Sequence, residues 1–280
     1  MKHKIAIHSV PRSGSTWLGE IFNSHKKTKY CFQPLFSYEF KDFITNVSSI
    51  SDVENFFDLL SRTNDKFVCQ KSEREVGSLP DFEKISVPTH VIYKEVRYHH
   101  LLEHLCELDV DLMFVLLVRN PIEVMSSWIS TPKEFDPSWN SSKELLKAEY
   151  KNAGKPENFY GLDAWIDTTK LFEFLAERYS DRVRLVNYKQ LKNDPENITK
   201  YLFEFCSLNY DETTELFLQD SSRKKVEGSY SVFRGGSKSK LALSDELLAT
   251  IEVKDPTPRK LQAYPRDRNH LGLESTQVPA

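Results

Sequence analysis

"AIHSVPRSGSTWL", Ala6–Leu18, is the stretch that decides the fold. Lys4–Ser9 is apolar and β-branched, as is typical of a strand, and Ser15–Asn23 carries apolar residues at helical spacing. The turn between them, Val10–Gly14, aims backbone N–H groups at the start of the helix, where the helix dipole adds positive potential. The stretch therefore predicts a strand, an anion-binding turn and a helix.

The side chains of this turn suit an anionic ligand. Gly14 lets the backbone approach closely, and Arg12 brings a fixed charge with a fork of donors. The hydroxyl donors beside them are Ser13, Ser15 and Thr16. A nucleotide P-loop requires GxxxxGKS/T, but Ser9 and Ser15 stand where its first Gly and its Lys belong, which makes a poor site for metal-bridged ATP. The alternative is a structural strand-to-helix turn with a Ser cap.

A second stretch, "LLVRNPIEVMSSW" at Leu116–Trp128, repeats the pattern of a strand end followed by a helix. Pro121 is favoured in the first helical turn. Arg119 falls at the strand end and Ser127 falls in the helix, so these two side chains could share one anion. In the alternative, Arg119 caps a carboxylate and the serines lie on the helix surface.

Strands and helices alternate along the rest of the chain. Further strands are expected at Lys66–Gln70, His90–Val96, Asp111–Val118 and Arg182–Asn187. Helices are expected at Pro121–Ile129 and about Phe159–Tyr179. The nearly unbroken apolar run at Asp111–Val118 suits a strand buried on both faces of a parallel sheet. The alternation predicts an α/β fold of three layers, with a central, mostly parallel sheet flanked by helices.

Composition and charge exclude several classes of protein. The chain has 280 residues, and its net charge of −3, from 38 basic and 41 acidic residues, lacks the basic surplus of a nucleic-acid-binding protein. No apolar run approaches the ~20 residues of a membrane helix and no signal-peptide core is present, so we expect a cytoplasmic protein without a membrane span. The four cysteines lie far apart, and His100 and His104 lack a third ligand, so no metal site is expected.

With both stretches taken together, the sequence resembles the sulfotransferases that use 3′-phosphoadenosine 5′-phosphosulfate (PAPS). "PRSGSTW" is similar to the 5′-phosphosulfate loop of that family, and "RNPIEVMSS" is similar to its 3′-phosphate motif. The Arg form of the loop is more like the carbohydrate and tyrosylprotein branches. The resemblance implies one P-loop-like α/β domain over residues 1–280 and no metal requirement. Both motifs would lie in residues 1–130, and residues 131–280 would form a helical region with a C-terminal clamp.

The resemblance also implies roles for individual residues. Arg12 would contact the transferring sulfuryl group, and the cradle around the 5′-phosphosulfate would be completed by Ser13, Gly14, Ser15 and Thr16. The 3′-phosphate would be held by Arg119 and Ser127. The adenine would lie near Trp17 and Tyr188. A C-terminal clamp would be formed by Arg234, Gly235 and Gly236, where Gly235 replaces the Lys of the family.

The general base is the open point of the site. An attacking hydroxyl must lose its proton, and a carboxylate or a His usually takes it. Related carbohydrate and tyrosylprotein enzymes carry a Glu at the place of Gln33, and an amide cannot act as a base. The nearby candidates are His25, Glu39 and Glu95. Glu95 is favoured because it follows a strand whose end should face the cleft, where Lys94 and Arg97 would attract an acidic substrate or the sulfonate oxygens.

The sequence thus predicts a PAPS-dependent sulfotransferase that releases 3′,5′-ADP. It would transfer the sulfuryl group directly and in line to a hydroxyl of an acceptor, expected to be a carbohydrate or glycoconjugate. One alternative is a P-loop-related kinase of a nucleotide or small molecule. The other is a non-catalytic nucleotide-binding module, which Gln33 favours.

Overall fold

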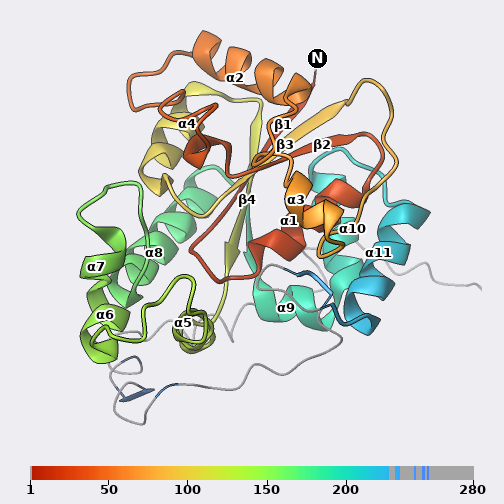
Figure 1. Cartoon of the computed structure of the whole chain (residues 1–280). Helices are drawn as coiled ribbons and strands as arrows, with labels where there is room; N and C mark the ends of the chain where they lie inside the picture. The colour runs from red at the N-terminus through yellow and green to blue at the C-terminus, as the bar shows by residue number, and fades with distance from the viewer. Residues whose placement is uncertain (1, 227–230, 234–242, 244–247, 250, 252–280) are drawn as a thin grey trace, which may run out of the picture.

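Five parallel strands form the central sheet in the order β2-β3-β1-β4-β5. A computed structural model describes residues 2–226, 231–233, 243, 248–249 and 251 (Figure 1). The strands are β1 (His3–Ser9), β2 (Thr28–Phe32), β3 (His90–Glu95), β4 (Leu112–Val118) and β5 (Val183–Asn187). The expected parallel sheet is confirmed, and β1 occupies its centre between β3 and β4.

The apolar residues of β4 alternate between two cores. Phe114 and Leu116 belong to one buried cluster, and Val115 and Leu117 belong to the other. All four side chains are fully buried, because helices cover both faces of the sheet. This explains why the sequence of β4 is apolar throughout and does not alternate with polar residues.

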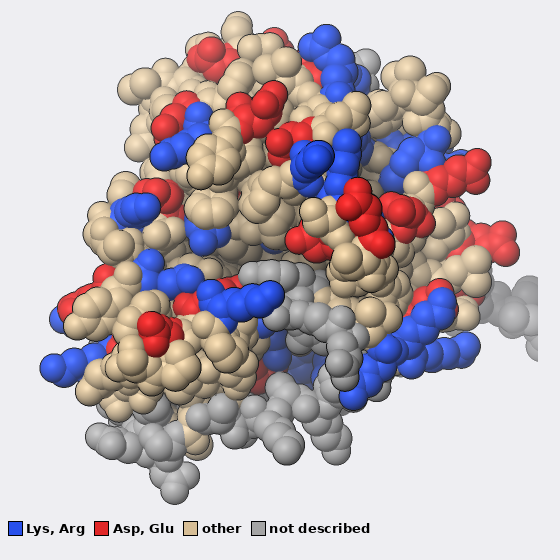
Figure 2. Space-filling view, in the orientation of Figure 1, with Lys and Arg blue, Asp and Glu red and all other residues tan. Residues whose placement is uncertain are grey.

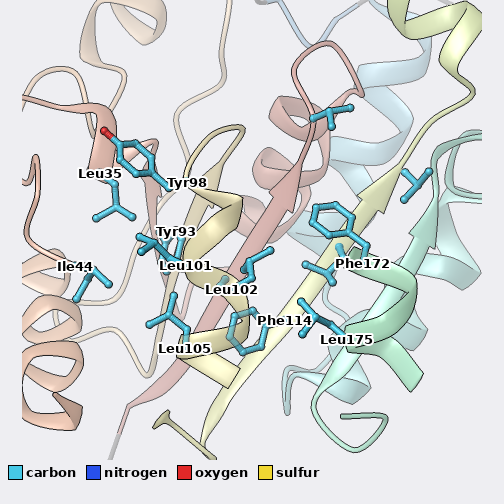
Figure 3. Close-up of a cluster of buried hydrophobic side chains, with 14 of the residues drawn as sticks. Leu35, Ile44, Tyr93, Tyr98, Leu101, Leu102, Leu105, Phe114, Phe172 and Leu175 are labelled. Carbon is cyan, nitrogen blue, oxygen red and sulfur yellow. The ribbon is translucent and has the colours of Figure 1, made fainter. Parts of the chain in front are cut away.

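Helices form the two outer layers of the fold (Figure 1). One layer contains α1 (Ser15–Ser24), α9 (Tyr188–Asn193), α10 (Pro195–Phe205) and α11 (Glu212–Arg223). The other contains α2 (Ile50–Arg62), α4 (Leu102–Leu108), α5 (Pro121–Ile129), α6 (Ser141–Lys147) and α8 (Leu162–Arg178). The short elements are α3 (Lys71–Glu75), α7 (Glu149–Asn152) and the 3₁₀ helices η1 (Pro34–Phe36) and η2 (His99–Leu101). Figure 3 shows part of the second layer's core, where side chains of α4 and α8 pack on β3 and β4.

One expected strand is wrong, and one real strand was not expected. Lys66–Gln70 forms turns instead of a strand, because Asp65 Oδ1 accepts from Val68 N–H at 2.8 Å and its carbonyl accepts from Cys69 N–H at 3.0 Å. These local hydrogen bonds hold the segment in turns, although the carbonyl of Val68 also accepts from Phe32 N–H of β2 at 2.8 Å. The edge strand β2 has the short sequence TKYCF, which begins with two polar residues and gives a weak strand signal.

All five strands run in the same direction, so their carboxyl ends meet along one edge of the sheet. This edge lies toward the bottom of Figure 1, where α1, α5 and α9 begin. Several residues near it adopt left-handed backbone conformations, namely Arg12 (φ 69°), Gly14 (φ 92°), Gln33 (φ 42°) and Tyr98 (φ 58°). Ligands of open α/β sheets bind at this edge, so a ligand site is expected there.

A pair of histidines in the core makes stability depend on pH. The Nδ1 atoms of His8 and His99 lie 3.1 Å apart, and His8 Nε2 lies 3.3 Å from the hydroxyl of Tyr93. Burial, followed by the charge of Lys94, lowers the pKa of His8 to about 3. Burial also lowers the pKa of His99 well below its usual value.

The unfolded chain therefore binds more protons than the folded chain below pH ~6.5. We expect the free energy of unfolding to fall as the pH drops from 6.5 toward 3, by up to ~1.4 kcal/mol per pH unit for each histidine. Urea unfolding at pH 7 and pH 5 measures this slope. His8→Gln should make the slope shallower, and an unchanged slope would assign the acid sensitivity to other groups.

Candidate active site

A cavity of about 580 Å³ opens at the carboxyl edge of the sheet. Residues near the carboxyl ends of all five strands line it, including Arg12, Gln33, Lys94, Arg119 and Tyr188. Its described lining is rich in positive charge, with seven basic side chains against two acidic ones. The basic residues are Arg12, Lys94, Arg97, Arg119, Lys133, Lys151 and Lys192, and the acidic ones are Glu73 and Glu134. Figure 2 shows Lys and Arg side chains, interspersed with Asp and Glu, on the face of the molecule seen in Figure 1.

The turn after β1 presents helix N–H groups to the cavity. Gly14 is the N-cap of α1, and no side chain of a described residue caps the helix, which leaves its first N–H groups open. Ser15 and Thr16 both line the cavity. A Cβ added at Gly14 would lie 2.4 Å from the ring of Tyr188, and its φ of 92° also favours glycine. The close approach therefore requires glycine at this position.

Arg12 connects the turn with the segment after β4. Its Nε donates to Ser127 Oγ at 3.3 Å, and its Nη1 donates to Glu134 Oε1 at 3.2 Å in an ion pair. Ser127 belongs to α5, and Glu134 belongs to the loop that follows α5. All three residues line the cavity, so the guanidinium of Arg12 faces into it.

Arg119 reaches the same place from the end of β4. Its Nη1 donates to the carbonyl oxygen of Arg12 at 3.1 Å, and its Nε donates to Glu123 Oε2 at 2.8 Å. Its guanidinium lies 4.5 Å from the ring centre of Tyr188. The two stretches singled out in the sequence therefore converge on one cavity.

Two aromatic residues stand beside these arginines. The rings of Trp17 and Tyr188 meet edge to face with centres 6.3 Å apart, and both residues line the cavity. Trp17 Nε1 donates to Ser221 Oγ of α11 at 3.0 Å, which fixes the indole. The structure thus brings together Arg12, Gly14, Ser15, Thr16, Trp17, Arg119, Ser127 and Tyr188.

Other expected site residues are placed differently. Ser13 is buried outside the lining, and its Oγ has no hydrogen-bond partner among the described residues. Among the proposed bases, His25 is buried against Asn209 and Glu39 is exposed, and neither lines the cavity. Arg234, Gly235 and Gly236 lie outside the described residues.

Glu95, the favoured base, is fully buried below η1 and does not line the cavity. Its Oε1 accepts from the N–H of Leu35 at 2.9 Å, and burial raises its pKa to about 8. This geometry does not support a direct role for Glu95 in proton transfer. Because successive residues of a strand point to opposite faces, the neighbouring Lys94 reaches the cavity instead.

The ends of β2 and β3 form a second part of the cavity. Lys94 Nζ lies 4.0 Å from the ring centre of Phe32. Burial lowers the pKa of Lys94 to about 7, the nearby charge of Arg97 adds to this shift, and the charge of Glu95 opposes it. The guanidinium of Arg97 lies 4.0 Å from the ring centre of Phe36. This part combines positive charge with aromatic rings.

Sequence reasoning missed several lining residues. Glu134, Lys151 and Tyr160 lie between α5 and α8, where the sequence has polar, proline-bearing segments and no recognisable motif. Trp128 Nε1 donates to the carbonyl of Glu134 at 3.2 Å and holds that loop against α5. No local sequence pattern predicts this contact, because it depends on tertiary packing.

Among the residues that the structure describes, no cluster of three or more His, Cys, Asp or Glu could hold a metal ion. None of the helices described is both long and apolar enough to span a membrane.

A parallel sheet whose β1 turn and β4 end share one basic cavity is characteristic of the P-loop-like α/β proteins. The chain belongs to the sulfotransferase domain family, which matches residues 2–244. Among solved structures, the mouse sulfotransferase SULT7A1 complexed with PAP is 15% identical, with a TM-score of 0.56 over 95% of this chain and 90% of that one. A sulfotransferase from Alicyclobacillus acidocaldarius is 11% identical, with a TM-score of 0.51 over 91% of each chain. These structures share the fold, and no curated protein sequence matches the chain.

Proposed function

We propose that this protein is a PAPS-dependent sulfotransferase that transfers a sulfuryl group directly and in line to a hydroxyl of a saccharide or glycoconjugate. The observation that carries the proposal is the convergence of Arg12 and Arg119 on one cavity, with Arg119 Nη1 bonded to the main chain of Arg12 at 3.1 Å. A single donor with a phosphosulfate at one position and a phosphate at another can engage both. The lack of a Walker lysine argues against the kinase alternative.

The donor would lie over the ends of β1, β4 and β5. The open N–H groups at the start of α1 would hold the 5′-phosphate, and the guanidinium of Arg12 would contact the transferring sulfuryl group. Arg119 and Ser127 would hold the 3′-phosphate, and Trp17 and Tyr188 would flank the adenine. Positive charge fixed in advance stabilises the charge that develops on the leaving phosphate without reorganisation.

Glu134 is the residue that we assign as general base. It and Glu73 are the carboxylates in the described lining, and Glu134 Oε1 lies 3.2 Å from Arg12 Nη1. When Arg12 engages the sulfuryl group, the carboxylate of Glu134 remains beside the reacting centre. It is then placed to take the proton of the attacking hydroxyl, the role for which Gln33 is chemically unsuited.

The acceptor side supports a saccharide. Phe36 and Phe67 are partly exposed, their ring centres lie 6.1 Å apart, and both line the cavity. The amides of Gln33 and Gln70 lie in the same lining. Aromatic faces pack against the apolar faces of sugar rings, and amide groups hydrogen-bond to sugar hydroxyls.

Ligand-dependent melting tests this function. We expect 3′,5′-ADP to raise the melting temperature more than Mg-ATP does, because the site provides for a 3′-phosphate. A larger shift with Mg-ATP would favour the kinase. Transfer of labelled sulfate from PAPS to a panel of saccharides then separates an enzyme from a non-catalytic nucleotide-binding module.

Arg119→Ala should weaken 3′,5′-ADP binding by roughly 10–100-fold, because charge-assisted hydrogen bonds contribute about 1.5–3 kcal/mol. Calorimetric titration with 3′,5′-ADP and with 5′-AMP measures the effect. Affinity for 5′-AMP, which lacks the 3′-phosphate, should change little. Equal losses for both ligands would place Arg119 elsewhere in the donor site.

A further inference from the structure

The residues that line the cavity come from two groups of strands in the sheet. The donor motifs follow β1, β4 and β5, whereas Gln33, Lys94 and Arg97 come from the ends of β2 and β3. The strand order places β3 and β2 on the far side of β1 from β4 and β5. If the donor occupies the first region, the acceptor must approach over the second.

Arg97 is held rigidly in this acceptor region. Its Nε donates to Asn158 Oδ1 at 3.0 Å and its Nη1 donates to Gln33 Oε1 at 2.8 Å, while its guanidinium stacks 4.0 Å from the ring centre of Phe36. Its Nη2 has no hydrogen-bond partner among the residues that the structure describes. Arg97 lines the cavity, so a fixed cation with spare donors is offered to whatever binds there.

Gln33 completes a site made of donors. Its side-chain oxygen is occupied by Arg97, which leaves its NH₂ group for a ligand. Its backbone is also fixed, because Gln33 N–H donates to the carbonyl of Lys94 at 2.7 Å and its carbonyl accepts from Phe36 N–H at 3.1 Å. A Glu at this position would pair with Arg97 and cancel its charge. Gln instead orients the guanidinium and leaves the charge uncompensated.

Lys151 adds to this charge, and Lys94, whose pKa burial lowers to about 7, adds to it in its protonated form. Within the described part of the chain, no salt bridge is formed by Lys94, by Arg97 or by Lys151. Lys151 Nζ lies 4.9 Å from the ring centre of Tyr160, and the ring of Tyr160 also lies 5.9 Å from the guanidinium of Arg97. Positive groups gathered around one opening, with no carboxylate of the described residues in salt-bridge contact with them, attract an anion.

We propose that the acceptor carries an oxyanion, a carboxylate or a sulfate ester, which Arg97 and Gln33 bind with the support of Lys151. The proposal rests on the proposed function, because it describes the acceptor of that reaction. The planar fork of Arg97 matches the two oxygens of a carboxylate. On this account, the amide of Gln33 selects an acidic acceptor. The proton of the attacking hydroxyl is taken by Glu134, as proposed above.

Matched acceptors test the proposal. The probes are phenyl glucosides and phenyl galactosides, each as the neutral sugar, the 6-carboxylate and the 6-sulfate, assayed with labelled PAPS and by melting in the presence of 3′,5′-ADP. We expect at least one charged form to bind about tenfold or more tightly than its neutral partner, since a charge-assisted hydrogen bond has that magnitude. Comparison of the 6-carboxylate probes with the 6-sulfate probes identifies which oxyanion the site prefers.

Two variants locate the effect. Arg97→Met removes the cation, and Gln33→Glu supplies an internal carboxylate for Arg97. In both variants the affinities for the charged and the neutral acceptor should differ by no more than about twofold. Asn64→Asp, an exposed change outside the cavity lining, should leave the preference intact. Neutral probes that bind as well as every charged one, or variants that keep the preference, would overturn the proposal. Failure of the proposed function looks different, with no 3′,5′-ADP binding and no transfer to any acceptor.

Discussion

Arg12→Ala should lower kcat for sulfuryl transfer by about 10²–10³-fold, as expected for loss of a group that stabilises charge in the transition state. The guanidinium projects into the cavity between Ser127 and Glu134 and is the charged side chain of the turn after β1. Its positive charge would stabilise the negative charge on the sulfuryl group during transfer. Single-turnover rates with labelled PAPS measure the change.

Affinity for 3′,5′-ADP should remain within about threefold of the native value, because that ligand lacks the sulfuryl group. The bond from Arg119 ends on the carbonyl of residue 12, which alanine retains. Arg62→Ala, an exposed change on α2, is the matched control and should leave the rate unchanged. Native rates in Arg12→Ala would remove this residue from the chemistry.

Glu134→Gln should lower kcat by about 10²–10⁴-fold, the usual contribution of a general base. The amide keeps the shape of the side chain but cannot accept the proton. Binding of 3′,5′-ADP should persist, because Glu134 pairs with Arg12 and does not contact Arg119 in any hydrogen bond of the described residues. Rates and calorimetric titrations on the same preparation separate the two effects.

Glu39→Gln is the control for this change, since Glu39 is exposed and lies outside the lining. It should transfer sulfuryl groups at the native rate. A Glu134→Gln protein with native kcat would exclude Glu134 as the base. Loss of 3′,5′-ADP binding in the same variant would instead indicate a structural role for the ion pair with Arg12.

The donor side of the site could be predicted because its signals are local. The turn at Val10–Gly14 is specified by neighbouring residues, and the end of β4 is marked by an apolar run that stops at Arg119. Parallel strands place such ends on one edge of the sheet, so two distant stretches could be expected to meet. The structure brings them to one cavity.

The base and the acceptor side could not be predicted in the same way. The choice between Lys94 and Glu95 depends on which face of β3 points to the cavity, and a shift of one residue reverses it. Glu134 reaches the site through a loop held by Trp128, a contact with no sequence signature. Lys66–Gln70 has the composition of a strand, but Asp65 supplies closer partners for its backbone.

The hydrogen bond from Arg119 to the carbonyl of Arg12 has a thermodynamic consequence. It ties the turn after β1 to the end of β4 through groups of the protein itself. The conformational entropy lost in ordering that turn therefore belongs to folding. Capture of the donor then proceeds with a smaller entropic penalty, and a larger share of the contact energy remains as affinity.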